Sequence, residues 1–281
     1  MNHYHAQRYQ GIQTYHDLFF FVGLPDPSFL ATDIEEVIRA GNSIQGVAHS
    51  KWLFITPRFR LWMQKIGQSS DIILVNGNLG GMTTGKISAL SVLTALFSRI
   101  QKTPDMIILY HFCCLHSQHG DPIVGPRGLL QSLIAQLLIY LHQHHKTPAR
   151  FSVMNNIFLH DVARRDLLAL CLFLSQLLEQ MERNTTVYCV IDAISEFETS
   201  LDGWNNEIAE IVTYFQDLVH NRSNGPVLKF LLIAPHRSIQ IYDQIRPDDQ
   251  IWLNSGNLLS DSVQQPAFDH DFQRAMQLER D

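Results

Sequence analysis

Four strand-length runs of apolar residues occur along the chain, and the stretches between them carry apolar residues at helical spacing. The runs are Ile72–Val75, Met106–Phe112, Val187–Asp192 and Leu228–Ala234. Runs that are apolar at nearly every position are typical of parallel strands covered by helices on both faces. The alternation of strands and helices therefore predicts an α/β fold, a three-layer parallel sheet in which the carboxyl ends of the strands form the ligand-binding edge.

Helical patterns fill the intervals between these strands. Apolar residues recur every three or four positions over the stretches Ile87–Ile100, Leu129–His142, Asp166–Met181 and Asn205–His220. Before the first strand, Asp33–Gly41 predicts a short helix that ends at glycine. We therefore divide the chain into a helical or irregular N-terminal segment (1–60), a main domain (61–237) and a polar C-terminal extension (238–281).

An aromatic segment leads into the first strand. Trp52, Phe54, Phe59, Leu61 and Trp62 lie within the stretch WLFITPRFRLW. We expect this segment to pack against the main domain, because large aromatic side chains contribute most when they are buried. Stacking on an adenine base is the alternative interpretation.

The turn after the first strand has the skeleton of a phosphate-binding loop. Residues 71–89 read DIILVNGNLGGMTTGKISA and contain the pattern Gly80-x4-Gly85-Lys86. A glycine-rich turn at a helix N-terminus binds phosphate through backbone N–H groups that lack partners within the helix, and the helix dipole favours negative charge there. The lysine of such a loop reaches the β- and γ-phosphates. The candidate nucleotide-binding residues are Gly80, Gly81, Thr83, Thr84, Gly85, Lys86, Ile87 and Ser88.

One position departs from the complete motif. Ile87 follows Lys86, where the motif has a serine or threonine whose hydroxyl binds Mg²⁺. Ser88 comes one residue later, which turns its side chain by about 100° on a helix, so we expect it to point elsewhere. The hydroxyls of Thr83 and Thr84 could compensate. An ordinary strand–turn–helix connection that happens to contain glycine and lysine is the alternative interpretation.

A second chemical feature lies at the end of the third strand, in VYCVIDAISEFE (187–198). An apolar strand ending in aspartate is typical of the Mg²⁺-binding carboxylate of phosphate-loop NTPases, so Asp192 is the candidate metal-binding residue, brought by the sheet beside the Gly80–Lys86 loop. Glu196 is the candidate catalytic residue, a base that activates water. The alternatives are a strand-end carboxylate that caps a turn and a solvated loop acid.

The fourth strand lacks the polar end that would sense a γ-phosphate. Ala234 and Pro235 occupy that position, and His236 and Arg237 are the polar residues that follow them. This departure weakens the prediction of γ-phosphate sensing.

Composition narrows the class of protein. The 281 residues carry a formal net charge of -6 without a run of lysine or arginine, so no nucleic-acid partner is expected. No stretch reaches 18 apolar residues and residues 1–18 are polar, so we expect neither a membrane span nor a signal peptide. The four cysteines lie in apolar segments without disulfide-like spacing, which predicts a reduced, cytoplasmic protein.

A group of histidines and cysteines raises the question of zinc. His111, His116 and His119 lie near Cys113 and Cys114. The spacing fits no closed four-ligand pattern, and we expect the two cysteines to point to opposite faces of a strand. The sequence therefore does not predict a zinc site.

Residues 51–237 resemble the fungal NACHT-type members of the STAND class of signal-transduction P-loop NTPases. The resemblance rests on WLFITPRFRLWM, the ILVNGN…GK loop, GPRGLLQSLIAQLL (125–138), VIDAISEFE and KFLLIAPHRS. It implies an oligomerisation switch that binds ATP or GTP with Mg²⁺ and lies between an effector region and C-terminal repeats. The chain departs from the family pattern at Ile87, at Ser195, where a second acidic residue is common, and at the apolar end of the fourth strand.

Two main hypotheses about function follow. In the first, the chain is a nucleotide-binding STAND-type signalling domain with slow hydrolysis, in which Lys86 binds phosphate, Asp192 holds Mg²⁺ and Glu196 orients water. Its partners are nucleotide and either further copies of itself or an effector-domain protein. In the second, the chain is a pseudo-NTPase that serves as a protein-interaction scaffold. A nucleotide kinase is a third interpretation, against which the lack of an arginine-rich lid argues.

Overall fold

The computed structural model describes residues 18–19, 21–24, 28–41, 53–54, 56–64, 69–78, 83–84, 87–100, 105–144, 156–221 and 225–253. At positions 64, 83, 84 and 156 it describes the backbone alone.

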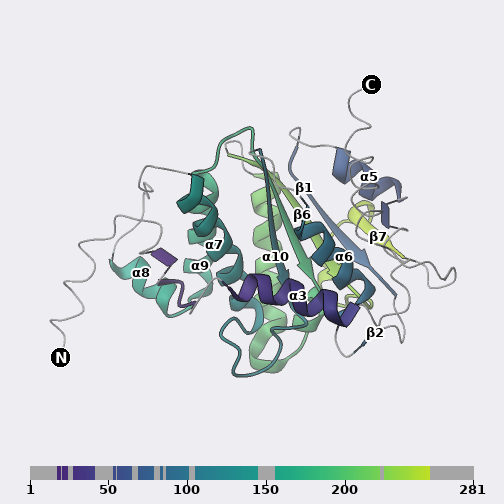
Figure 1. Cartoon of the computed structure of the whole chain (residues 1–281), viewed down its shortest axis with the longest axis horizontal. Helices are drawn as coiled ribbons and strands as arrows, with labels where there is room; N and C mark the ends of the chain where they lie inside the picture. Colours follow the sequence, from purple (N-terminus) through teal and green to yellow (C-terminus); the bar gives the residue numbers. More distant parts are fainter. Residues whose placement is uncertain are drawn as a thin grey trace.

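Five parallel strands form the central sheet, in the order β4–β5–β6–β1–β7. They are β1 (Asp71–Asn76), β4 (Met106–Phe112), β5 (Thr186–Asp192), β6 (Val227–Ala234) and β7 (Gln250–Trp252). The four longer strands are buried at nearly every position, as expected of strands covered on both faces. The parallel three-layer α/β fold predicted from the sequence is confirmed (Figure 1).

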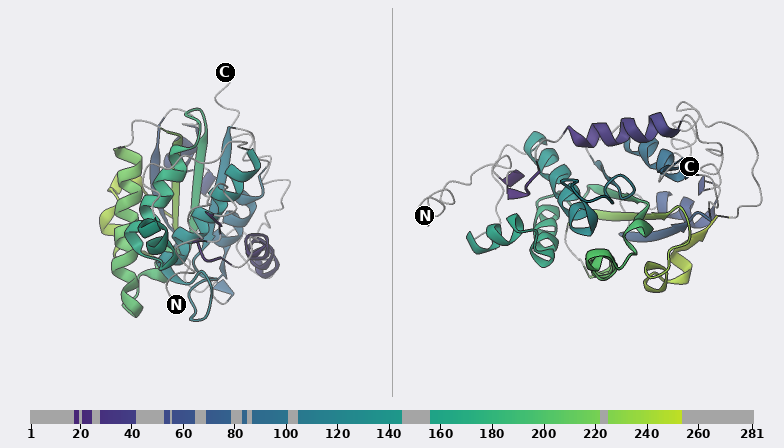
Figure 2. Two further views of the ribbon diagram at one scale, coloured as in Figure 1. Left: turned by 90° about the vertical axis from the view of Figure 1, so that its left-hand side faces the viewer. Right: turned by 90° about the horizontal axis from the view of Figure 1, so that it is seen from below.

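Helices cover both faces of this sheet (Figure 2). One face carries α3 (Phe29–Gly41), α5 (Pro57–Gln64) and α6 (Ala89–Ser98). The other carries α7 (Gly125–His144), α9 (Leu167–Glu179) and α10 (Trp204–His220), with α8 (Asn156–Ala163) packed on α9. Within the described ranges, no helix has both the length and the apolar character needed to cross a membrane.

Two aromatic contacts identify the faces to which the strand side chains point. Tyr188 of β5 contacts Phe97 of α6, with ring centroids 5.8 Å apart, whereas Phe230 of β6 stacks on Phe215 of α10 at 4.4 Å. Tyr188 is level with Lys229, the residue before Phe230, so Tyr188 and Phe230 point to opposite faces. Alternation along the strands then assigns the residues at the strand ends to the α6 face or to the α10 face.

Short elements connect the main ones. The pair β2 (Thr83–Thr84) and β3 (Ile87–Ser88) is antiparallel and lies between β1 and α6 in the sequence. The 3₁₀ helices η2 (Ile194–Phe197) and η3 (Leu201–Gly203) link β5 to α10, while α11 (Ile241–Gln244) and η4 (Pro247–Asp249) link β6 to β7.

The sequence predicted four strands and missed the fifth. Strand β7 has three residues and lies in the segment interpreted as a polar extension, where only a short apolar patch is visible. It pairs with the last three residues of β1, Leu74–Asn76. A strand of three residues is too short to show a hydrophobic pattern in the sequence, so its pairing with β1 is what defines it.

Three helices begin two or more residues from the predicted position. The helix expected over Asp33–Gly41 begins four residues earlier, at Phe29. The helix expected over Ile87–Ile100 begins at Ala89, because Ile87 and Ser88 belong to β3 and Ser88 is the N-cap. The helix expected over Leu129–His142 begins four residues earlier, at Gly125.

The aromatic segment packs in the core. The ring of Trp62 is fully buried and lies 5.5 Å from that of Phe59, 6.4 Å from that of Phe97 and 5.4 Å from that of Tyr188. The predicted packing is confirmed for Phe59 and Trp62, and the adenine-stacking alternative is wrong for both, since neither ring is accessible. Leu61, expected to pack with them, is instead 45% exposed, because it lies on the outer side of α5. Trp52 lies outside the described residues.

Candidate functional site

At the end of β1, the backbone passes close to the loop after β6 and to α6. Asn76 is fully buried, and its Oδ1 accepts a hydrogen bond from the N–H of Ser238 at 3.0 Å. Its Nδ2 has no acceptor among the described residues. At the next position, Gly77, a Cβ would lie 2.6 Å from the carbonyl oxygen of Pro235 and 2.8 Å from Leu90 Cδ1. Glycine therefore lets the chain leave the strand between two tightly packed neighbours.

The start of α6 is closed by its own side chains. Ser88 Oγ accepts a hydrogen bond from the N–H of Ser91 at 3.1 Å, and Ser91 Oγ accepts one from the N–H of Ser88 at 3.0 Å. This reciprocal pair is a capping box. The side chain of Ile87 is buried in the core and offers no hydroxyl. The hydroxyl at position 88 thus serves the helix cap, in place of the metal ligand that the motif has at position 87.

Asp192 is a fully buried carboxylate at the end of β5. It lies two residues after Val190 and four after Tyr188, so it points to the face that carries α6. Its Oδ2 lies 3.8 Å from Cys114 Sγ, and its Oδ1 has no hydrogen-bond partner within the described part of the chain. Burial raises the pKa of the Asp192 carboxyl to about 7, an effect that the nearby Ser91 hydroxyl partly offsets.

A cation fits this carboxylate. A buried polar atom without a partner is costly, and a carboxylate oxygen is a ligand that Mg²⁺ prefers. Asp192 is the described residue that would hold the ion. The fit has a limit, since no group of three histidine, cysteine, aspartate or glutamate residues in the described ranges is arranged to hold a metal. The other ligands would therefore be water and phosphate oxygens.

The sheet separates Asp192 from the end of β1 by one strand, because β6 lies between β5 and β1. Asp192 instead lies near Ser91, in the first turn of the helix that follows the glycine-rich loop. For Thr83 and Thr84 the structure describes the backbone alone. The remaining residues predicted for this loop lie outside the described residues and stay predictions: Gly80, Gly81, Gly85 and Lys86.

Glu196 lies near Asp192. It is half-buried in η2, which follows Ala193, a residue with a φ of 54°. The charge of Glu196 is among the influences that raise the pKa of Asp192. The structure thus brings the two carboxylates together, and the catalytic role of Glu196 stays a prediction.

The two neighbouring cysteines are placed differently from the prediction. They do not point to opposite faces of a strand, because β4 ends at Phe112 and both residues lie in the turn that follows. Both are buried, and burial together with the negative charge of Asp192 raises the pKa of the Cys113 and Cys114 thiols well above the usual value. Such thiols are unreactive, which indicates a packing role.

Sequence analysis missed the residue that shapes the loop after β6. The carboxylate of Glu198 accepts hydrogen bonds from the hydroxyl of Ser238 at 2.8 Å and from the N–H groups of Ile239, Gln240 and Ile241 at 2.7–2.9 Å. It therefore anchors this loop to the segment after β5. Glu198 belongs to the same segment, VIDAISEFE, and lies two positions after Glu196.

A buried histidine joins α3 to the carboxyl edge of the sheet. His116 Nδ1 lies 2.9 Å from Asp121 Oδ2, and His116 Nε2 lies 3.1 Å from Asp33 Oδ2 of α3. The ring of His111 lies 5.0 Å away. Burial lowers the pKa of His116, but the hydrogen bonds and charges of Asp33 and Asp121 outweigh burial, so the pKa is raised.

The raised pKa of His116 predicts a pH-dependent contribution to stability. Because the folded protein binds this proton more tightly than the unfolded chain, the stabilisation is complete below the unfolded pKa of about 6.5 and is lost as pH rises through the folded value. We expect His116→Gln to lower the free energy of unfolding more at about pH 5.5 than at about pH 8.5. Urea unfolding at the two pH values measures this difference.

His119→Gln is the matched control for this experiment. The side chain of His119 is 69% exposed and faces an exposed Asp202. Its replacement should change the free energy of unfolding little at either pH. An equal loss of stability in His116→Gln at both pH values would contradict the assigned charge of His116.

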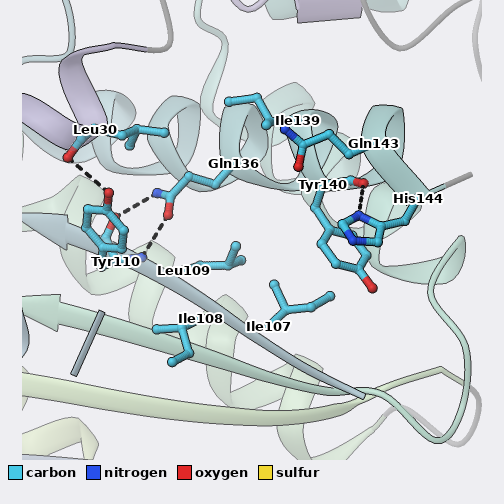
Figure 3. Close-up of a pocket in the computed structure, with 10 residues that line it drawn as sticks. All are labelled: Leu30, Ile107, Ile108, Leu109, Tyr110, Gln136, Ile139, Tyr140, Gln143 and His144. Atoms are coloured by element: carbon cyan, nitrogen blue, oxygen red, sulfur yellow. Dashed lines mark hydrogen bonds between the residues drawn. The ribbon is translucent and has the colours of Figure 1, made fainter. Parts of the chain in front are cut away.

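The cavity in Figure 3 lies away from this edge. It encloses about 310 Å³ between the edge strand β4 and the second half of α7, and Ile107, Leu109 and Tyr140 are among its lining residues. At its end, the side-chain amide of Gln136 bonds both the N–H and the C=O of Tyr110, at 3.1 and 2.8 Å. Gln136 thus satisfies backbone groups that a neighbouring strand would otherwise bond.

Comparison with known proteins gives one family. The family model described as nephrocystin 3, N-terminal, matches residues 49–234, which is more than half of the chain. The match runs from just before α5 to the end of β6 and so includes Asp192 and the glycine-rich segment. No curated protein matches the chain.

Proposed function

Because the chain belongs to the nephrocystin 3 N-terminal family, we propose that it is a nucleotide-binding signalling domain of the STAND class. In this proposal it binds ATP or GTP with Mg²⁺ and hydrolyses the nucleotide slowly. The NACHT-type relationship is part of the proposal and rests on the sequence resemblance. The nucleotide-bound form would contact further copies of the chain or an effector-domain protein.

The observation that carries the proposal is the buried carboxylate of Asp192. Its Oδ1 has no partner among the described residues, and it lies at the carboxyl edge of a parallel sheet, where such folds bind ligands. The amide Nδ2 of Asn76 is a second buried polar group without a described partner at this edge. A carboxylate oxygen is the kind of ligand that the Mg²⁺ of a nucleotide complex requires. Asn76 is level with Ala234 and points to the α10 face, opposite to Asp192, so the proposal rests on the carboxylate alone.

Each residue has a defined task in this proposal. Lys86 and the backbone of the glycine-rich loop bind the phosphates. Asp192 would hold the Mg²⁺, which when bound would neutralise charge on the phosphate oxygens. Glu196 accepts a proton from water. Because Ile87 supplies no ligand, metal binding is weaker than with the complete motif, and slow turnover follows.

A scaffold without nucleotide is the second candidate function. Two observations favour it: the side chain of Ile87 is buried in the core, and Ser88 and Ser91 are used in the helix cap. If the hydroxyls of Thr83 and Thr84 do not replace the Mg²⁺ ligand that is missing at Ile87, the domain keeps its fold but does not hydrolyse nucleotide. The same binding experiment distinguishes the two functions.

The test is calorimetric titration of the whole chain with ATP and ADP, with and without Mg²⁺. We expect the wild type to bind and Lys86→Ala to bind roughly tenfold to a hundredfold more weakly, since hydrogen bonds to charged groups contribute about 1.5–3 kcal/mol. Asp192→Asn should remove the gain in affinity that Mg²⁺ confers.

Arg183→Ala is the matched control, because it also removes one positive charge. Arg183 is exposed in the turn before β5, at the amino edge of the sheet, opposite to the site. Its replacement should leave nucleotide affinity unchanged. A folded wild type that binds neither ATP nor ADP would contradict the nucleotide proposal and leave the scaffold.

A further inference from the structure

An exposed aromatic and cationic cluster lies at the carboxyl end of β7. Trp252 is 42% exposed, and its ring centroid lies 5.5 Å from that of Tyr242 in α11. The guanidinium carbon of Arg237 lies 5.3 Å from the centroid of Tyr242 and 5.7 Å from that of Trp252. The other two described tryptophans, Trp62 and Trp204, are buried. Trp252 is thus the described tryptophan that a ligand can reach.

The cluster lies where the glycine-rich loop begins. Trp252 is level with Asn76, the last residue of β1. The N–H of Leu253 bonds the carbonyl oxygen of Asn76 at 2.9 Å, and Asn78 Nδ2 bonds the carbonyl oxygen of Leu253 at 3.1 Å. Two bonds thus hold the end of β7 against the first residues of the loop that we propose to bind phosphate.

The order of the strands gives a direction to a nucleotide at this edge. Asp192, the proposed Mg²⁺ carboxylate, lies on β5, whereas Trp252 lies on β7, on the opposite side of β1. The metal-bound β- and γ-phosphates would lie toward β5. The rest of the nucleotide would then extend in the opposite direction, toward the end of β7.

We infer that Trp252 and Arg237 form the base-binding subsite of the proposed nucleotide site. This inference rests on the proposed function. The ligand part is the planar base of a nucleoside triphosphate, which stacks on the indole ring while the guanidinium of Arg237 lies beside it. Stacking uses the π face that every base has, so this subsite favours nucleotides over inorganic phosphates and discriminates weakly between ATP and GTP.

The first test compares two ligands that share the phosphates. Calorimetry measures binding of ATP and of inorganic tripolyphosphate to the wild type and to Trp252→Ala. We expect Trp252→Ala to weaken ATP binding roughly tenfold to a hundredfold and to leave tripolyphosphate binding unchanged, since stacking acts on the base alone. Trp252→Phe, which keeps a ring, should lose less affinity for ATP.

The matched control is Ile239→Ala. Ile239 lies in the loop after β6, is 76% exposed and is apolar like Trp252. Its replacement should affect neither ligand. As an independent readout, ATP but not tripolyphosphate should quench tryptophan fluorescence in the wild type, and this quenching should be lost in Trp252→Phe.

The outcomes separate the inference from the proposed function. ATP binding that requires Lys86 but is unchanged in Trp252→Ala would overturn the inference and leave the proposed function intact. Equal losses for ATP and tripolyphosphate in Trp252→Ala would assign Trp252 a structural role and would also overturn it. A folded wild type that binds neither ligand would overturn both proposals.

Discussion

Replacing Gly128 with alanine is expected to destabilise the protein by about 3 kcal/mol. A Cβ at Gly128 would overlap the carbonyl oxygen and carbonyl carbon of Ile123. These are backbone atoms, and the N–H of Ile123 is held by Asp121 Oδ1 at 2.8 Å, so the neighbour cannot move aside. In an ordinary helix, the same substitution would stabilise by about 1 kcal/mol. The effect expected at Gly128 therefore has the opposite sign to that of the same substitution in an ordinary helix, and it is larger.

Urea unfolding of Gly128→Ala and Gly120→Ala measures the effect. At Gly120 a Cβ would meet nothing within 4 Å. Gly120→Ala should therefore lose only about 1–2 kcal/mol, which is what an L-residue costs at a φ of +94°. A Gly128→Ala variant at least as stable as the wild type would contradict the close approach of α7 to the preceding loop.

The second large effect is expected from Trp62→Ala, about 3–5 kcal/mol of lost stability. The indole of Trp62 is fully buried and contacts aromatic rings of α5, α6 and β5. Its removal leaves a cavity between α5, α6 and β5. Chemical unfolding measures the loss of stability.

Leu61→Ala is the matched control for Trp62→Ala. Leu61 is the preceding residue of the same helix, and it is 45% exposed. Its replacement should cost less than about 1 kcal/mol. Equal losses from the two variants would show that α5 does not pack against the sheet as described.

The four long strands could be predicted from the sequence because a strand that is buried on both faces is apolar at nearly every position. Met106–Phe112 was predicted as a strand and is one, with the same bounds. Strand β7 carried no such pattern, because three residues cannot show a period, and only pairing with β1 defines it. The start of α6 was misplaced for a related reason, since the β2–β3 pair that takes Ile87 out of the helix is a contact between residues, absent from the local pattern.

Part of the candidate site was also readable. An aspartate that ends a buried strand marks the carboxyl edge of the sheet in the sequence, and Asp192 is there, with Glu196 nearby. Spacing could not reveal that Ser88 and Ser91 close the helix cap on each other, or that Glu198 accepts four hydrogen bonds from the loop after β6. Both facts depend on the directions of side chains.

The α/β class, the four long strands and the positions of the glycine-rich loop and the strand-end aspartate can all be predicted from the sequence. These follow from hydrophobic period and strand length, which are local properties of the chain. The strand order, the burial of Trp62 and the exposure of Trp252 beside the end of β1 are visible only in the folded protein. Strand order and burial depend on contacts between residues far apart in the chain. Trp62 and Trp252 have similar apolar neighbours in the sequence, so the local pattern does not show which of them will be buried.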